Sequence, residues 1–404
     1  MIHALLILVL ALGGDDPGVV GRAGPTPDEQ FRALRDAHQA AFDAFAKAAN
    51  EAKTDADQAK VLDHPGRQTP RFMPPFLDLA RKYPGTTAAE DALLWVATHA
   101  MQSQECEEAK RLLTRDFARS ARIGPALGFQ GRYADYSATS EAFFREVVAK
   151  NPDRDLRGLA TYWLARHLLN KAAGAKAARK DPNFGRESVA YYDRFLGEGW
   201  ADRLRKADPD ALESEAESLL ERVAKFHADV PHNDKRRRPG TLGDAARSYL
   251  REGRVLALGR PAPEFEGTDL DGRPFRLADQ RGKVVLLDFG SHFYCGSCRQ
   301  AYPKLRELTR RLEGRPFVLV SINAEPEKDR KQLKEAWAEA GNTWPCLFDG
   351  DWEGPIQRAW NVTRFPTIYV LDGSGTIRFK GDLRADMVDE VVRLVGEAEG
   401  VGSK

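Results

Sequence analysis

Two cysteines, Cys295 and Cys298, stand shortly after an apolar run, and this arrangement narrows the possible folds more than any other part of the sequence. The run, Val284–Phe289, is apolar without alternation apart from Asp288, which is typical of a strand buried on both faces. The residues after Cys295 are predicted to form a helix, whose first turn brings the second sulfur back beneath the first. The sequence therefore predicts two neighbouring thiols at the junction of a buried strand and a helix.

The chain has four cysteines in 404 residues, at positions 106, 295, 298 and 346. That number is too small for a disulfide scaffold, and a zinc site would need a second cysteine pair or two histidines at ligand spacing. The pair is therefore interpreted as redox-active, and we expect neither a metal nor another cofactor. Cys346 lies in an apolar segment and is expected to be a core residue. Cys106 begins a predicted helix and is expected to be exposed.

Thiol–disulfide exchange explains why these residue types stand at this position. Unpaired N–H groups and the helix dipole lower the pKa of a thiol at a helix N-terminus, so Cys295 is predicted to attack and Cys298 to resolve. A buried Asp288 would have a raised pKa and could accept the proton of the resolving thiol. The alternative is an ordinary strand-end carboxylate. His292 could favour the thiolate when charged, or could be an exposed loop residue without a role.

The C-terminal third of the chain alternates strands with helices. Gly259–Pro263 is a stiff connector, and Asp271-Gly272 predicts a hairpin turn. We expect strands at 284–289, 317–322, 346–348, 367–371 and 376–380, and helices after Cys295, at 330–340 and at 387–395. This order predicts an α/β domain with a central mixed sheet flanked by helices.

The preceding region, from Pro27 to about Val255, predicts helices instead. Apolar residues recur at helical spacing from Phe31 to Phe45, and similar periods cover 72–82, 87–101, 105–117, 138–150, 156–170, 187–197, 211–229 and 243–252. Trp95 and Trp163 lie 68 positions apart in similar segments, as do Pro84 and Pro152. That separation equals two units of 34 residues, which is the length of a tetratricopeptide repeat, so the region resembles tetratricopeptide-like helical pairs. A generic helical bundle with a chance repeat is the alternative.

The N-terminal residues predict export. Met1–Leu12 is almost wholly apolar and too short to span a bilayer, so residues 1–14 are interpreted as a signal peptide, although no Lys or Arg precedes the apolar run. Residues 15–26 predict a flexible spacer. A buried N-terminal strand is the alternative. We expect a helical domain at 27–255, a redox domain at 256–404, and a location in the periplasm or cell envelope.

Several segments of the redox domain together resemble the TlpA/ResA-type thiol–disulfide oxidoreductases, a thioredoxin-like family in the redoxin group. These segments are 259–265, 269–272, 281–289, the Cys-Gly-Ser-Cys motif and 365–367. The resemblance covers about residues 256–398. It implies a dithiol active site, a cis bond before Pro366, and reduction of disulfides in partner proteins, with Phe365, Pro366 and Thr367 contacting the client.

Three departures from this family are visible. Six residues separate Asp288 from Cys295, one more than thioredoxins usually have. Ala301 stands where many relatives carry a glutamate, so the usual nearby acid of the subgroup is absent. The dipeptide between the cysteines is Gly-Ser rather than Gly-Pro, and the redox potential depends on it.

Two rival functions remain open. A thiol peroxidase of the peroxiredoxin group has a Pro and a Thr or Ser before its cysteine, at positions where this chain has Asp288 and His292. A helical-repeat scaffold with a vestigial redox domain is the other. The expected partners are client proteins with disulfides, an upstream thiol reductant that could be membrane-bound, and a protein bound by the helical domain. A formal net charge of +1 argues against nucleic acid.

Overall fold

A computed structural model describes residues 24–64, 66, 69–99, 103–133, 136–181, 183–184, 189–232, 240–351, 354–383 and 385–401. It divides into two compact units, Met1–Ala216 and Glu217–Lys404, which are described separately. The predicted signal peptide and most of the predicted spacer lie outside the described residues. The predicted boundary after residue 255 follows directly on α13 (Leu242–Arg254), the last α-helix before the main sheet, whereas the compact units divide after Ala216.

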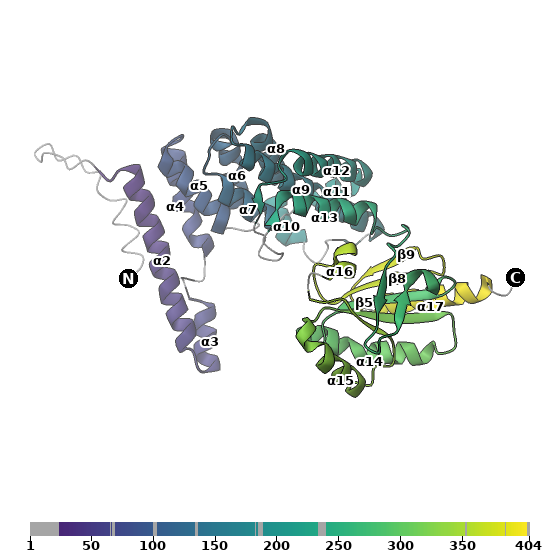
Figure 1. Cartoon of the computed structure of the whole chain (residues 1–404). Coiled ribbons are helices and arrows are strands. Elements are labelled where there is room, and N and C mark those ends of the chain that lie inside the picture. Colours follow the sequence, from purple (N-terminus) through teal and green to yellow (C-terminus); the bar gives the residue numbers. More distant parts are fainter. Residues whose placement is uncertain are drawn as a thin grey trace, which may run out of the picture. The chain divides into compact units, whose positions relative to one another are not determined.

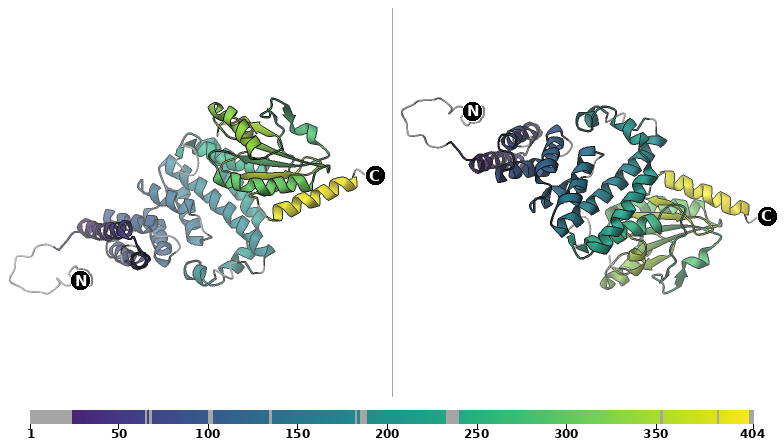
Figure 2. Two further views of the ribbon diagram at one scale, coloured as in Figure 1. Left: turned by 90° about the horizontal axis from the view of Figure 1, so that it is seen from below. Right: turned by 90° about the horizontal axis from the view of Figure 1, so that it is seen from above.

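The first unit is built from helices, in the described part of the chain, and those from α4 to α9 pack side by side as successive layers (Figure 1; Figure 2). Polar capping residues determine where several of these helices begin. Thr26, Ser103 and Asp153 each accept a hydrogen bond from an N–H group in the first turn of the helix that follows. The helices are α2 (Pro27–Glu51), α3 (Asp55–Leu62), α4 (Met73–Lys82), α5 (Thr87–His99), α6 (Gln104–Phe117), α7 (Gly124–Arg132), α8 (Ala138–Lys150), α9 (Arg154–Lys180), α10 (Val189–Leu196), α11 (Trp200–Lys206) and the start of α12 (Pro209–Phe226), with a 3-10 turn at Thr69–Phe72.

The two repeated tryptophans are both buried, one in α5 and one in α9. Trp95 stacks on Phe76 with ring centroids 4.0 Å apart, and α4 packs on α5. Trp163 is 1% exposed and α8 packs on α9 in the same order. The tetratricopeptide-like assignment remains a prediction. Helices α3, α7 and α11 were not predicted, because α7 contains three glycines and α3 and α11 have only eight and seven residues.

The second unit begins with the end of α12 and a short antiparallel pair, β1 (Pro231–His232) and β2 (Gly240–Thr241), inside a region that was expected to be wholly helical. Helix α13 (Leu242–Arg254) follows, capped at Thr241. Its polar contacts with the sheet domain include three side chains: Ser248 Oγ lies 2.6 Å from Asn361 Oδ1, Arg251 donates to the Ala359 carbonyl oxygen at 2.7 Å, and Glu252 pairs with Lys380.

A five-stranded sheet forms the rest, in the order β7-β6-β5-β8-β9. Strands β5 (Val284–Gly290), β6 (Phe317–Asn323) and β7 (Cys346–Phe348) are parallel. Strand β8 (Thr367–Leu371) pairs antiparallel with β5, and β9 (Ile377–Gly381) pairs antiparallel with β8, so β9 runs in the same direction as β5. A separate hairpin, β3 (Glu266–Thr268) and β4 (Pro274–Arg276), turns at the predicted Asp271-Gly272. The expected α/β class with a mixed central sheet is confirmed.

Side chains alternate along β5 and divide the core into two layers. Val284 and Leu286 face one layer, with α14 (Gly296–Arg311), α15 (Arg330–Glu339) and α17 (Ala385–Val401). Val285, Leu287 and Phe289 face the other, with the β3–β4 hairpin and α16 (Pro355–Ala359). Since Asp288 and Gly290 follow Leu286 at steps of two residues, they face the layer that contains α14.

Packing of Trp163 against α7 gives a stability prediction. A Cβ at Gly131 would lie 2.0 Å from Trp163 Cδ2, whereas a Cβ at Gly128, one turn earlier on the same helix, meets nothing within 4 Å. We expect Gly131→Ala to destabilise the helical unit by about 1–3 kcal/mol and Gly128→Ala to stabilise it by about 0.5–1 kcal/mol. Urea unfolding followed by circular dichroism measures both. Equal effects of the two substitutions would contradict this packing.

Candidate active site

The two cysteines lie where β5 gives way to α14. Cys295 is the N-cap residue of α14, and its sulfur accepts a hydrogen bond from the Cys298 N–H at 3.1 Å. The Ser297 hydroxyl lies 3.4 Å from the same sulfur. The two cysteines form a disulfide, with Cys295 8% and Cys298 2% exposed. Cys295 thus has the helix-start position that favours a thiolate, and Cys298 is the more buried sulfur.

Cys298 packs directly on the end of β5. A Cβ at Gly290 would lie 3.2 Å from the Cys298 sulfur, so the absence of a side chain there brings α14 close to the strand. Asp288 is two residues earlier and therefore points to the same face of the sheet. This geometry brings the predicted acid and the predicted resolving cysteine to one face of one strand.

Asp288 is buried, at 4% exposure, among apolar and aromatic neighbours. Burial raises its pKa to about 6, while a 2.8 Å hydrogen bond from the Ser321 hydroxyl acts in the opposite direction. Trp344 Nε1 in turn donates to Ser321 Oγ at 2.9 Å. The carboxyl group can therefore gain or lose a proton near neutral pH, as a proton acceptor for Cys298 would have to.

The loop between β5 and the cysteines is held by Glu325, a residue that the sequence pattern did not single out. Glu325 is fully buried and accepts hydrogen bonds from the Ser291 hydroxyl and the Phe293 N–H, both at 2.9 Å. Burial raises the pKa of Glu325. Its position just after β6 could have indicated this role, because the carboxyl ends of the parallel strands β5 and β6 lie at the same edge of the sheet. The longer loop is thus tied to the neighbouring strand.

His292 lies inside the structure, at 9% exposure, where its ring stacks on Tyr302 at a centroid distance of 5.8 Å. Burial lowers its pKa, and the nearby Arg299 guanidinium lowers it further. A neutral imidazole is therefore favoured, and neither the charged nor the exposed role expected for His292 fits.

The remaining cysteines are both buried. Cys346 is a core residue, as expected, and burial raises its pKa well above the ordinary value. The expected exposure of Cys106 is wrong: it is 1% exposed, and Gln130 Nε2 donates to its sulfur at 3.4 Å. Its sulfur is thus turned toward Gln130 of α7 and away from solvent.

The Phe365–Pro366 bond is cis, as predicted. Pro366 immediately precedes β8, whose Thr367 pairs with Phe289 in the antiparallel register, so the proline lies beside the end of β5. Ser297 and Ala301 of α14 line a hollow of about 510 Å³ together with Phe365 and Pro366. We call this hollow the groove. It lies beside the dithiol, because its lining residue Ser297 has its hydroxyl 3.4 Å from the Cys295 sulfur.

Burial of Asp288 gives a pH prediction. Its folded pKa of about 6 exceeds the ordinary 3.8, so the folded protein binds more protons than the unfolded chain between these pH values. The free energy of unfolding therefore falls as pH rises through this window, by about 3 kcal/mol at most. We expect Asp288→Asn to become more stable relative to the wild type from pH 4 to pH 7 by up to about that amount. Urea unfolding of both oxidised proteins measures it, and parallel pH profiles would refute it.

Comparison with known proteins places this geometry in a family. The AhpC/TSA family model matches residues 258–380. The Bacillus subtilis thioredoxin-like protein YneN is 34% identical over 132 residues, which are 32% of this chain and 75% of that protein. The thiol-disulfide oxidoreductase ResA of Geobacillus kaustophilus is 30% identical over 132 residues, 32% of this chain and 72% of that protein.

Among solved structures, the thioredoxin domain of a thiol-disulfide oxidoreductase from Bacteroides vulgatus is 27% identical, with a TM-score of 0.32, and covers 35% of this chain and 99% of that one. YneN and the Geobacillus kaustophilus ResA are each at least 30% identical to this chain and are matched over more than two thirds of their length. The chain therefore belongs, through its C-terminal domain, to the ResA-type thiol–disulfide oxidoreductases of the AhpC/TSA redoxin family.

Proposed function

We propose that this protein is an exported oxidoreductase that reduces disulfides of envelope client proteins through Cys295 and Cys298. The observation that carries the proposal is the placement of Cys295 at the N-cap of α14 with the buried Cys298 packed on Gly290. The names of the relatives, thiol-disulfide oxidoreductase ResA and thiol:disulfide interchange protein DsbE, support the same chemistry.

The exchange runs in two displacements. The Cys295 thiolate attacks one sulfur of a client disulfide, forms a mixed disulfide, and releases the other client sulfur as a thiolate. Cys298 then loses its proton, with Asp288 as the proposed acceptor, and attacks the Cys295 sulfur. The Cys295–Cys298 disulfide forms and the reduced client leaves. An upstream thiol reductant returns two electrons and restores the dithiol.

The groove supplies the client contacts in this proposal. Phe365 can pair, strand-like, with an extended client peptide, next to Pro366 and beside the sulfurs. Thr367 is buried, and its hydroxyl donates to the Arg364 carbonyl oxygen at 2.8 Å, so its role is to hold the loop in shape.

Two assays on the pure protein separate this function from its rivals. With dithiothreitol present, the protein should accelerate the reduction of insulin disulfides. With a thiol reductant and hydrogen peroxide, it should consume peroxide no faster than free thiols do, because Asp288 and His292 occupy the positions of the peroxidase residues and both are buried. Fast peroxide turnover would favour a peroxidase, and inactivity in both assays would favour a scaffold.

The different roles of the two cysteines give a further prediction. Cys298→Ser should accumulate mixed disulfides with clients, because nothing resolves them, whereas Cys295→Ser should form none and lose insulin reduction entirely. Iodoacetamide alkylation against pH, on the two reduced variants, should show Cys295 reacting faster than Cys298 at neutral pH. Faster alkylation of Cys298 would reverse the assignment.

Export is the part of the proposal that concerns the N-terminal residues. In the part of the chain that the structure describes, no helix is both long and apolar enough to cross a bilayer. We expect residues 1–26, fused to alkaline phosphatase, to give phosphatase activity in intact bacteria, since that enzyme folds only where disulfides form. A fusion that starts at residue 27 is the control, and equal activity of the two would contradict export.

A further inference from the structure

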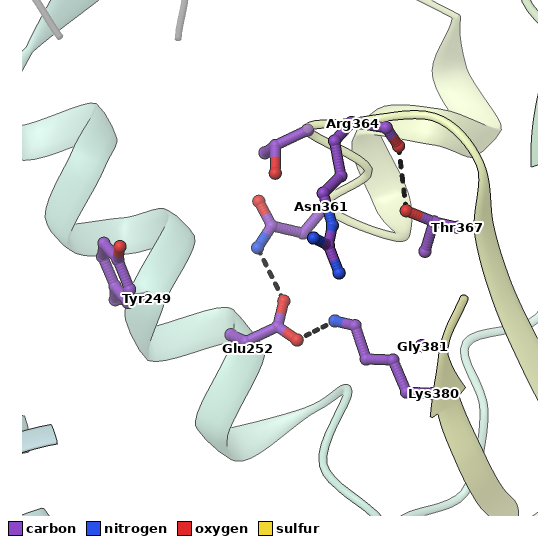
Figure 3. Close-up of a pocket in the computed structure, with 8 residues that line it drawn as sticks. Tyr249, Glu252, Asn361, Arg364, Thr367, Lys380 and Gly381 are labelled. Carbon is purple, nitrogen blue, oxygen red and sulfur yellow. Dashed lines mark hydrogen bonds and ion pairs between the residues drawn. The ribbon is translucent and has the colours of Figure 1, made fainter. Parts of the chain in front are cut away.

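A second hollow lies next to the groove, on the other side of the cis-proline loop, and α13 forms one of its walls. Its volume is about 260 Å³, enough for a small polar side chain. Tyr249 and Glu252 come from α13, Asn361 and Arg364 from the loop before β8, and Lys380 from β9 (Figure 3). Helix α13 ends at Arg254, so this wall lies outside the segment 258–380 that matches the family model.

The charges in this hollow do not balance. Glu252 pairs with Lys380 and accepts a hydrogen bond from Asn361 Nδ2 at 2.8 Å. Burial lowers the pKa of Lys380 to about 8, so at pH 7 the ammonium is still mainly charged and neutralises Glu252. Arg364 adds a second cation, and its side chain extends from the loop toward Glu252 and Lys380 (Figure 3). The hollow therefore holds one more positive than negative charge.

Arg364 has a partner that an incoming anion can displace. Its guanidinium lies 3.4 Å from Asp382, and the two side chains are 69% and 38% exposed. Exposed ion pairs of this kind contribute little, because water solvates both charges. A carboxylate placed in the hollow would meet the guanidinium and, beside it, a second cation, the charged Lys380.

Arg364 also connects the hollow to the dithiol. The same side chain lines the groove with Ser297 and Pro366, and Phe365 follows it directly in sequence. A client peptide that pairs with Phe365 would thus carry residues close to its cysteine past Arg364, since neighbouring residues of an extended chain are only about 3.3 Å apart.

We infer that this hollow is a client-specificity subsite, in which Arg364 and α13 accept the carboxylate of an acidic residue close to the client's reactive cysteine. The inference rests on the proposed function and adds to it the chemical class of client. Glu252 sets the strength of the preference, because its charge offsets one of the two cations.

The test uses short peptides whose single cysteine is joined to 5-thio-2-nitrobenzoate through a disulfide. One flanking residue, on either side of the cysteine, is Glu, Gln or Lys. Attack of reduced Cys295 on the peptide sulfur releases the coloured thiolate, whose appearance gives the second-order rate constant. We expect the wild-type protein to react about threefold to fivefold faster with a Glu peptide than with its Gln counterpart, and added salt should reduce this ratio.

Two variants shift the Glu-to-Gln ratio in opposite directions. Arg364→Gln should abolish the preference, and Glu252→Gln should increase it, an effect that mere loosening of α13 would not produce. Lys283→Gln is the matched control: it removes an exposed positive charge just before β5, at the end of the sheet away from Gly290, and should keep the wild-type ratio. Melting curves check that each variant is folded.

The outcomes separate the two proposals. Reaction with all peptides at equal rates would overturn the subsite and leave the oxidoreductase function standing. A preference for Glu that persists in Arg364→Gln would also overturn the subsite alone. Failure of the reduced protein to react with any peptide would overturn the proposed function, and the subsite with it.

Discussion

The contact between the Cys298 sulfur and Gly290 determines the geometry of the redox site. It fixes the distance between α14 and β5, because any side chain at Gly290 would push the sulfur away. With that distance set, Cys295 falls at the helix start, where N–H groups meet its sulfur, and Asp288 falls on the same face of the strand. The register of β8 then brings the cis-proline loop to the end of the same strand.

The strands of the redox domain were predictable because their signals are local. Apolar runs, turn residues and the cysteine spacing marked β5, β7 and β8 to within a residue, and the resemblance of segments 259–289 and 365–367 to a known family predicted the cis bond before Pro366. The burial of Asp288 was an alternative that the sequence left open. Only the tertiary structure decides whether Asp288 is buried, because its desolvation depends on the packing of distant residues such as Tyr302 and Trp344.

Other features depend on contacts between distant segments and have no local signal in the sequence. Glu325 holds the loop before Cys295 from more than thirty positions away. The Cys106 sulfur is turned toward Gln130 of α7, a glycine-containing helix whose own signal was too weak to detect. The short β1–β2 pair is likewise joined to the start of α13, where the Leu242 and Gly243 N–H groups donate to the Val230 and Ala228 carbonyl oxygens. In each case, the residue that determines the local environment lies far away in the sequence, outside the short segment whose periodicity predicts a helix or a strand.

The ion pair between Glu252 and Lys380 has a consequence for dissecting this protein. A fragment cut at the boundary that the sequence pattern suggests, after residue 255, would keep Lys380 and discard its counter-ion. The freed ammonium would then face water or lose its proton, and the amide of Asn361 would lose both of its acceptors, Glu252 and the Ser248 carbonyl oxygen. A redox fragment that keeps this ion pair therefore has to include α13 and its capping residue, Thr241.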